Sequence, residues 1–255
     1  MTARCAARQM LCVAVLTLLS VAPAVGCELS VRIESDKQSS AAGAYNYHRL
    51  SRQSYALLTA LLAKVSCQLK QQPLPAGRAI KMLEDGELAI MVGMSATEER
   101  GQYFYFVGPH HTERMVLVGP KAIAGRITSL TQILTSPGLI SVTEGGYYGP
   151  KWQALLDKTP ELQQRLFYAS GNQQKLAMLA SGRVMASMED ETVVDELLEQ
   201  GGLTQRYTKL LVVHENPVYF AFSRKVISEQ RYLQLQQSWQ QMQQSGEVER
   251  IRNSF

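Results

Sequence analysis

The 255-residue sequence lacks the motifs that would support metal, nucleotide or covalent chemistry. Its four histidines show no metal-binding spacing such as H-E-x-x-H, and no Cys/His cluster is present. A P-loop, a dinucleotide-binding fingerprint and a G-x-S-x-G nucleophile elbow are also missing. We therefore expect no metal and no cofactor, and no motif favours an enzyme.

Net charge is also low, and the longest apolar run stands at the start of the chain. Arg4 and Arg8 precede MLCVAVLTLLSVAPAVG, which ends in small residues and is short for a membrane-spanning helix. This pattern is typical of a secretory signal peptide over residues 1–26. Removing its two arginines, with no acid among these residues, lowers the formal net charge from +4 to +2. Such a protein gives no electrostatic reason to expect nucleic acid as a partner.

Only two of the four cysteines, Cys27 and Cys67, remain after the signal peptide. An even pair in an oxidising compartment is typical of a disulfide. Closing a loop of about forty residues would stabilise the fold by roughly 4 kcal/mol in the chain-entropy model. The alternative is a lipidated Cys27, because AVGC loosely resembles a bacterial lipobox, and Cys67 would then have no partner.

Strand-like and helix-like patterns alternate along the mature chain. Residues 28–95 predict three strands separated by helices at 49–65 and 76–86, an order that implies parallel strands with right-handed crossovers. The pattern restarts after RMVLVGP (114–120) and includes a helix at TSLTQIL and separate strands at 207–213 and 217–223. MLEDGELAIMVGMS and MLASGRVMASMEDE echo each other, which favours two α/β halves.

Three local patterns give further expectations. The glutamine-rich stretch 234–244 predicts a solvated helix face opposite buried Leu233, Trp239 and Met242. The pair His110–His111 stands just before the expected crossing between the halves, where we expect it to be exposed. The aromatic residues 103–106 are expected to pack in the core and near the hinge.

The stretch GMSATEER (93–100) follows the apolar run LAIMV. In open α/β sheets, ligands bind outside the carboxyl ends of the strands. Arg100 could form a bidentate pair with a carboxylate there, helped by the hydroxyls of Ser95 and Thr97. The alternative is a surface ion pair of Arg100 with a nearby glutamate: Glu98, Glu99 or Glu113.

The order strand, G-x-S-x-T-x-x-R, then the aromatic-rich YFYFVGP resembles family 3 of the extracellular solute-binding proteins of polar amino-acid importers. PLPAGRAIKMLEDGELAIMVGMSATEER is similar to the family's P-x-x-R, helix, glycine, strand and carboxylate-binding loop. LISVTEGGYYGPKW resembles its second-lobe strand, turn and helix, and LASGRVMASMEDE its G-R-x-D-A segment. FAFSRK and SGEVERI resemble the closing strand and terminal helix, so the likeness spans most of the mature chain.

The resemblance implies an α/β, two-lobed type II periplasmic binding protein fold, each lobe a mostly parallel sheet flanked by helices, with a two-strand hinge. After the signal peptide (1–26), we expect lobe 1 at 27–113 plus 218–255 and lobe 2 at 114–217. The implied protein is a periplasmic monomer that captures a small zwitterion, an amino acid or related carboxylate, by hinge closure. It would deliver this ligand to an ABC permease in the inner membrane.

In lobe 1, the resemblance places the ligand's α-carboxylate at Arg100, with help from Ser95 and Thr97 and backbone contacts from Gly93. These residues match the family's carboxylate-binding loop as they stand in this sequence.

In lobe 2, Gly145 and Gly146 would open the helix that carries Tyr147, whose free N–H groups suit a carboxylate. Asp190 stands where the family has the acid that binds the α-ammonium group. The alternative for Asp190 is a purely structural residue at a helix N-terminus.

The sequence departs from the family in its first loop, where P-P-F and G-F-x-x-D are replaced by SDKQSSAAGAYNYHRLSRQ. Tyr45 or Tyr47 would supply the missing aromatic wall of the site. Gly146 replaces a threonine of many members, and Leu88 and Met185 replace aspartates. The identity of the ligand therefore stays open.

Two other classes of function share the implied fold. One is the extracellular sensor module that feeds a receptor, and the other is a small set of secreted enzymes. These include cyclohexadienyl dehydratases and a lytic transglycosylase lobe. In an enzyme, Glu144 or Glu189 near the cleft would be the acid, and it would need a raised pKa.

Overall fold

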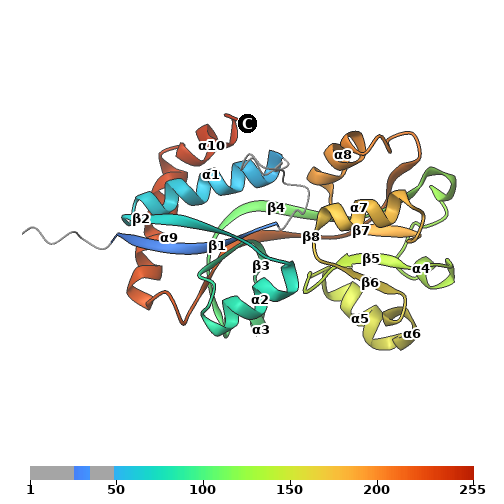
Figure 1. Cartoon of the computed structure of the whole chain (residues 1–255), viewed down its shortest axis with the longest axis horizontal. Helices are drawn as coiled ribbons and strands as arrows, with labels where there is room; N and C mark the ends of the chain where they lie inside the picture. The colour runs from blue at the N-terminus through green and yellow to red at the C-terminus, as the bar shows by residue number, and fades with distance from the viewer. Residues whose placement is uncertain (1–25, 35–48) are drawn as a thin grey trace, which may run out of the picture.

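The computed structural model describes residues 26–34 and 49–255 (Figure 1). The expected signal peptide, apart from Gly26, lies outside the described residues, and so does the divergent loop with Tyr45 and Tyr47. Among the helices that the structure describes, none combines the length and the apolar character needed to cross a membrane.

The first part of the chain alternates strands and helices as its sequence periodicity predicts. Strand β1 pairs in parallel with both β2 and β3. The elements are β1 (Cys27–Ile33), α1 (Arg49–Ala63), β2 (Cys67–Pro73), α2 (Ala76–Asp85), β3 (Ile90–Ser95) and α3 (Glu98–Gly101).

Two long antiparallel strands, β4 (Phe104–Pro120) and β8 (Tyr207–Ser223), form the middle of the molecule. Figure 1 shows them running between a group made of β1–β3 with α1, α2, α9 and α10 and a group made of β5–β7 with α4–α8. The remaining elements are η1 (Lys121–Ile123), α4 (Gln132–Thr135), β5 (Ile140–Thr143), α5 (Pro150–Lys158), α6 (Pro160–Gln163), β6 (Leu166–Ala169), α7 (Asn172–Ala180), β7 (Ala186–Asp190), α8 (Glu191–Gln200), α9 (Glu229–Gln244) and α10 (Glu247–Arg252).

The eight described strands form one sheet in the order β2-β1-β3-β8-β4-β7-β5-β6. The three strands at each end are parallel to one another, and β8 and β4 join the two ends through antiparallel pairing. This is the α/β, type II periplasmic binding arrangement expected from the sequence. The carboxyl ends of β3 and β7 therefore face each other from the two sides of β4 and β8.

Three sequence-based element predictions were wrong in extent. Residues 207–213 and 217–223 form one strand, and so do the aromatic-rich run and RMVLVGP, because ladder pairing between β4 and β8 continues through polar residues such as Thr112 and Asn216. The helix predicted at TSLTQIL is only the four-residue α4. Its start is replaced by a local turn, in which the Gln132 side chain accepts hydrogen bonds from the backbone of Thr128 and Ser129.

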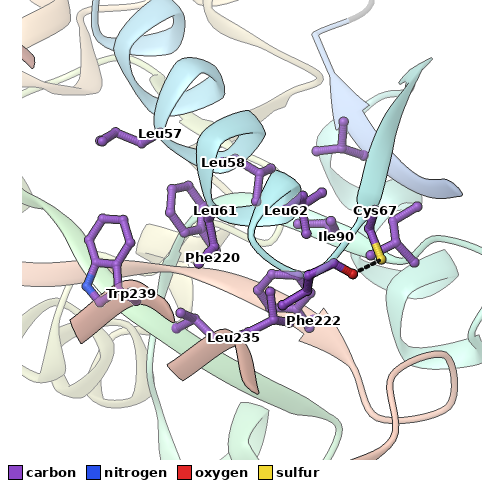
Figure 2. Packing of buried hydrophobic residues seen from close by; sticks show 14 of the residues in the cluster. Leu57, Leu58, Leu61, Leu62, Cys67, Ile90, Phe220, Phe222, Leu235 and Trp239 are labelled. Carbon is purple, nitrogen blue, oxygen red and sulfur yellow. Dashed lines mark hydrogen bonds between the residues drawn. The ribbon is translucent and has the colours of Figure 1, made fainter. Parts of the chain in front are cut away.

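The buried apolar side chains form two groups that divide the chain by sequence. The first core contains residues from 27–107 and 220–251, and the second core contains residues from 115–213. In the first core, leucines of α1 pack near Phe220, Phe222 and Trp239 (Figure 2). The two cores are connected through β4 and β8, which contribute buried residues to both.

Helix α9 buries one stripe and exposes the rest, but the stripe differs from the predicted one. Leu235, Trp239 and Met242 are buried, whereas Leu233 is 56% exposed. Positions 235, 239 and 242 are separated by four and three residues and share one helix face. Leu233 precedes Leu235 by only two residues, which places it on a different face.

The predicted disulfide between Cys27 and Cys67 is confirmed. The two cysteines are direct partners in the register of β1 and β2, and 40 residues separate them in the sequence. Because the Cys27 sulfur takes part in this bond, it is not free to carry a lipid.

Candidate functional site

A cavity of about 230 Å³ lies between the two cores. The first core contributes residues from α1, α2, the end of β3 and α3. The second core contributes the turn after β5, one face of α7 and the end of β7. The wall between them is formed by His110, His111, Glu113 and Met115 of β4 and by Val218 of β8. The ends of β3 and β7 also line the cavity, as expected for a site at the carboxyl ends of strands.

Arg100 connects the two cores at this cavity. Its Nη1 donates to the backbone oxygen of Ser95 at 3.1 Å, and its Nη2 donates to the backbone oxygen of Gly145 at 2.8 Å. Burial lowers the pKa of this guanidinium, while the carboxylates of Glu113 and Glu99 act in the opposite direction. Two of its five N–H donors are occupied by these carbonyls, so others are available to a ligand.

The surface ion pair considered for Arg100 is not formed. Within residues 26–34 and 49–255, no carboxylate lies within 4.0 Å of its guanidinium nitrogens. Arg100 instead lines the cavity, as a carboxylate-binding residue must.

The other residues predicted for the carboxylate site of the first lobe are Gly93, Ser95 and Thr97, and they have different environments. Gly93 lines the cavity and adopts φ +74°, which favours glycine. Ser95 is buried at the cavity wall, where its hydroxyl accepts from Asn216 at 3.1 Å and keeps its own hydrogen available. Thr97 does not line the cavity, and its hydroxyl caps α3 by accepting from the Arg100 backbone N–H at 3.3 Å.

The turn after β5 brings Gly145, Gly146 and Tyr147 to the opposite wall. Gly145 adopts φ +71°, and a Cβ atom there would lie 2.4 Å from the Ile80 Cδ1 atom of the first core. Tyr147 does not lie on a helix as predicted, because α5 begins at Pro150, three residues later. Its ring instead meets the His214 ring edge-on at 5.5 Å.

Asp190 lies in the cavity wall and also caps a helix. Its Oδ1 accepts from the backbone N–H and the hydroxyl of Thr192 at 2.8 and 2.6 Å, and its Oδ2 lies 3.1 Å from His111 Nε2. Burial raises the pKa of Asp190, but the bonds to His111 and Thr192 outweigh it, so its net shift is downward. The structural role at a helix N-terminus is confirmed, and contact of Asp190 with a ligand stays a prediction.

A buried ion pair that also lines the cavity was not predicted from the sequence. Lys175 is 2% exposed, and its Nζ lies 2.8 Å from Glu189 Oε2 and 3.0 Å from the Met188 backbone oxygen. Burial alone would lower the pKa of Lys175, but Glu189, followed by Tyr148 and Glu34, acts in the opposite direction, and the net shift is upward. The sequence signal that could have indicated this buried pair is a lysine within the apolar pattern of α7, four residues before Leu179.

The prediction that His110 and His111 are exposed was wrong. His110 is 4% exposed and stacks on Phe220 with ring centroids 4.3 Å apart. Its Nε2 accepts the Gly93 N–H at 3.2 Å, and its Nδ1 lies 3.4 Å from the Ser54 hydroxyl. Because burial lowers its pKa to about 3, the ring is neutral and can be tolerated inside the fold.

Glu113 is a second cavity residue that sequence reasoning treated only as a surface partner. It is half-buried, and burial, followed by the nearby Asp190 and Glu189 carboxylates, raises its pKa to about 8. The part of the chain that the structure describes holds no group of three His, Cys, Asp or Glu side chains suited to a metal ion.

A family model for the bacterial extracellular solute-binding proteins, family 3, matches residues 53–255. Similar solved structures include the amino acid ABC transporter substrate-binding protein AbpA from Streptococcus pneumoniae bound to L-arginine, 17% identical, with a TM-score of 0.68 over 89% of this chain and 93% of that one. An ancestral arginine-binding protein bound to arginine is 18% identical, with a TM-score of 0.69 over 89% of this chain and 97% of that one.

A histidine kinase sensor domain with similarity to periplasmic binding proteins is 12% identical, with a TM-score of 0.70 over 90% of this chain and 95% of that one. At these identities the likeness to solved structures shows the fold alone. A search of curated proteins found no match. The family match covers most of the sequence, and the chain therefore belongs to the bacterial extracellular solute-binding proteins, family 3.

Proposed function

We propose that this chain is a periplasmic binding protein that captures an amino acid, or a closely related zwitterion, and delivers it to an ABC permease. The observation that carries the proposal is the arrangement of charge in one cavity. The Arg100 guanidinium lies on one side, and the carboxylates of Glu113 and Asp190 line the same space. A small molecule with a carboxylate and an ammonium group is complementary to both.

The ligand's carboxylate would bind Arg100. Charge-assisted, bidentate bonds from a guanidinium are strong and directional, and Arg100 is held in place by the backbone oxygens of Ser95 and Gly145. The Ser95 hydroxyl and the turn at Gly146 offer further donors nearby. Thr97 would act indirectly, since its hydroxyl fixes the helix that carries Arg100.

The ligand's ammonium group would bind on the acidic side of the cavity. Asp190 has three hydrogen bonds from protein groups, which leaves limited acceptor capacity for a ligand. Tyr147 would pack against the ligand from the second core. Tyr45 and Tyr47 remain candidates for an aromatic wall.

We infer two lobes, 27–113 plus 218–255 and 114–217, that close around this ligand. The two groups of buried residues support this division, with β4 and β8 as the hinge strands. Hinge closure is one of the ways in which periplasmic binding proteins respond to ligands. A ligand that touches both lobes favours the closed state because it binds that state more tightly.

Two observations bear on the other functions. The likeness to a histidine kinase sensor domain supports a sensing role as the second candidate, and a neighbouring kinase gene rather than a permease gene would favour it. An enzyme is less well supported. Glu189 is held in an ion pair by Lys175, and Glu144 is exposed, so neither has the environment of a general acid.

A thermal-shift screen of the purified mature protein tests the proposal. We expect one or a few amino acids to raise the melting temperature, because ligands that bind only the folded state stabilise it. The matching amines without a carboxylate should give no shift. A protein stabilised by no amino acid, or equally by the decarboxylated amines, would contradict the proposed ligand class.

A further inference from the structure

Glu113 faces the cavity because of its place on β4. Side chains alternate between the two faces of a strand, and His111, Glu113 and Met115 all line the cavity. Arg114, between two of them, does not line it and pairs with Glu191 and Glu215 at the surface. The direction of the Glu113 side chain is therefore fixed by the strand.

Glu113 is also the cavity carboxylate with no hydrogen bond or ion pair to the described part of the protein. Asp190 is bound by His111 and Thr192, and Glu189 by Lys175. Glu144 lines the cavity too but is exposed to solvent. A half-buried carboxylate needs a partner when it is ionised, and the described protein supplies none.

When Glu113 is ionised, the charges around the cavity do not balance for a zwitterion. Three cationic and four acidic side chains of the described residues line it: Arg32, Arg100 and Lys175, against Glu113, Glu144, Glu189 and Asp190. Lys175 and Glu189 neutralise each other. A ligand whose carboxylate binds Arg100 and whose ammonium binds near Asp190 then leaves an ionised Glu113 without a positive partner among the described residues.

We propose that Glu113 selects ligands that carry a second positive charge, so that the cavity takes a cationic amino acid in preference to a neutral one of the same shape. This rests on the proposed function and assigns a role to Glu113 that the family motif does not contain. Desolvated charge pairs discriminate between ligands, because a ligand without the second positive charge leaves Glu113 either protonated or ionised and unpaired.

Binding should also release a proton. Within the protein, burial and the Asp190 and Glu189 carboxylates raise the pKa of Glu113 to about 8, while Lys175 and Arg100 act against them. Glu113 therefore carries a proton at neutral pH. A bound cation favours the carboxylate form, so the carboxyl proton passes to solvent as the cation takes its place. The other titratable or charged groups that line the cavity are Arg32, Tyr55, His110, His111, Glu144, Tyr147 and Tyr148.

Calorimetric titration with L-arginine and L-citrulline tests this inference. Citrulline has the length and shape of arginine, but a neutral urea replaces the guanidinium. We expect wild type at about pH 8 to prefer arginine by at least about tenfold, as expected for a charged hydrogen bond. Glu113→Gln should reduce the preference to about twofold or less. Glu215→Gln removes an exposed carboxylate outside the cavity and should keep it.

The pH dependence gives a second readout. Between about pH 6 and 8, wild-type affinity for arginine should rise with pH, by at most about tenfold per unit for one released proton. Glu113→Gln should lose this rise. Because this variant retains His111, the pH dependence that it loses comes from Glu113. Glu113→Asp, which retains the charge, should keep part of both effects.

The outcomes separate this inference from the proposed function. Retention of the full arginine preference by Glu113→Gln overturns the inference, and so does a wild type that prefers citrulline or binds only neutral amino acids. In those cases the proposed function stands. A wild type that binds no amino acid overturns both. If Glu113→Gln binds neither arginine nor citrulline, the same comparison is made with Glu113→Asp. Loss of the arginine preference in folded Glu113→Asp overturns the inference.

Discussion

At the scale of a single residue, His110 supports the loop at 93–100. The ring accepts the Gly93 N–H, stacks on Phe220 and has its other nitrogen near Ser54. A protonated ring could not accept the bond from Gly93, since both nitrogens would then be donors. The shape of the loop thus depends on a histidine that stays neutral.

Acid should therefore destabilise the fold through His110. Its pKa is about 3 in the fold and about 6.5 in the unfolded chain, so below pH 6.5 only the unfolded chain gains the proton. The free energy of unfolding should fall by up to about 1.4 kcal/mol per pH unit from this group. Between about pH 7 and 5, urea unfolding should show wild type losing about 2 kcal/mol more than His110→Gln. A difference between the two proteins that does not change with pH would contradict this.

At this scale, the prediction succeeded where the residue type limits the chemistry. Arg100 does line the cavity, together with Gly93 and Ser95. It failed where the environment decides. Nothing in the order of residues indicates that His110 is buried or that Glu113 has no partner among the residues that the structure describes.

At the scale of elements, periodicity predicted most helices and strands, because an apolar stripe or an alternating pattern must face a core. The errors occur where another interaction replaces that signal. The polar middle of β4 and β8 stays in the ladder through backbone pairing. Helix α4 is shorter than predicted because the Gln132 side chain accepts hydrogen bonds from Thr128 and Ser129, which form a turn instead of the first helical residues.

Helix α9 offers a matched test of which stripe holds it to the first core. Leu235 is fully buried and Leu233 is 56% exposed. We expect Leu235→Ala to lower the free energy of unfolding by about 2 to 5 kcal/mol, because it removes buried surface and leaves a cavity. Leu233→Ala should change it by less than about 0.5 kcal/mol. Equal costs in chemical denaturation would mean that the helix is packed in another rotation.

For the whole molecule, the contacts between the two cores surround the cavity. The Ala76 N–H donates to the Ser170 backbone oxygen at 3.2 Å, the Asn172 N–H donates to the Glu34 carboxylate, and Arg100 bonds to Gly145. The echoing segments of the sequence indicated two halves. They could not indicate the acidic side of the cavity, because Glu113, Lys175 and Glu189 come from separate elements that only the fold brings together.

The central claim is that Arg100 holds the carboxylate of an amino acid between the cores. Calorimetric titration of the strongest amino acid from the screen into wild type, Arg100→Ala and Arg126→Ala tests it most directly. Arg126 is exposed and does not line the cavity, so its loss controls for the removal of one positive charge. We expect Arg100→Ala to weaken binding by about 100-fold or more and Arg126→Ala to leave it unchanged. Wild-type affinity in a folded Arg100→Ala protein would contradict the account.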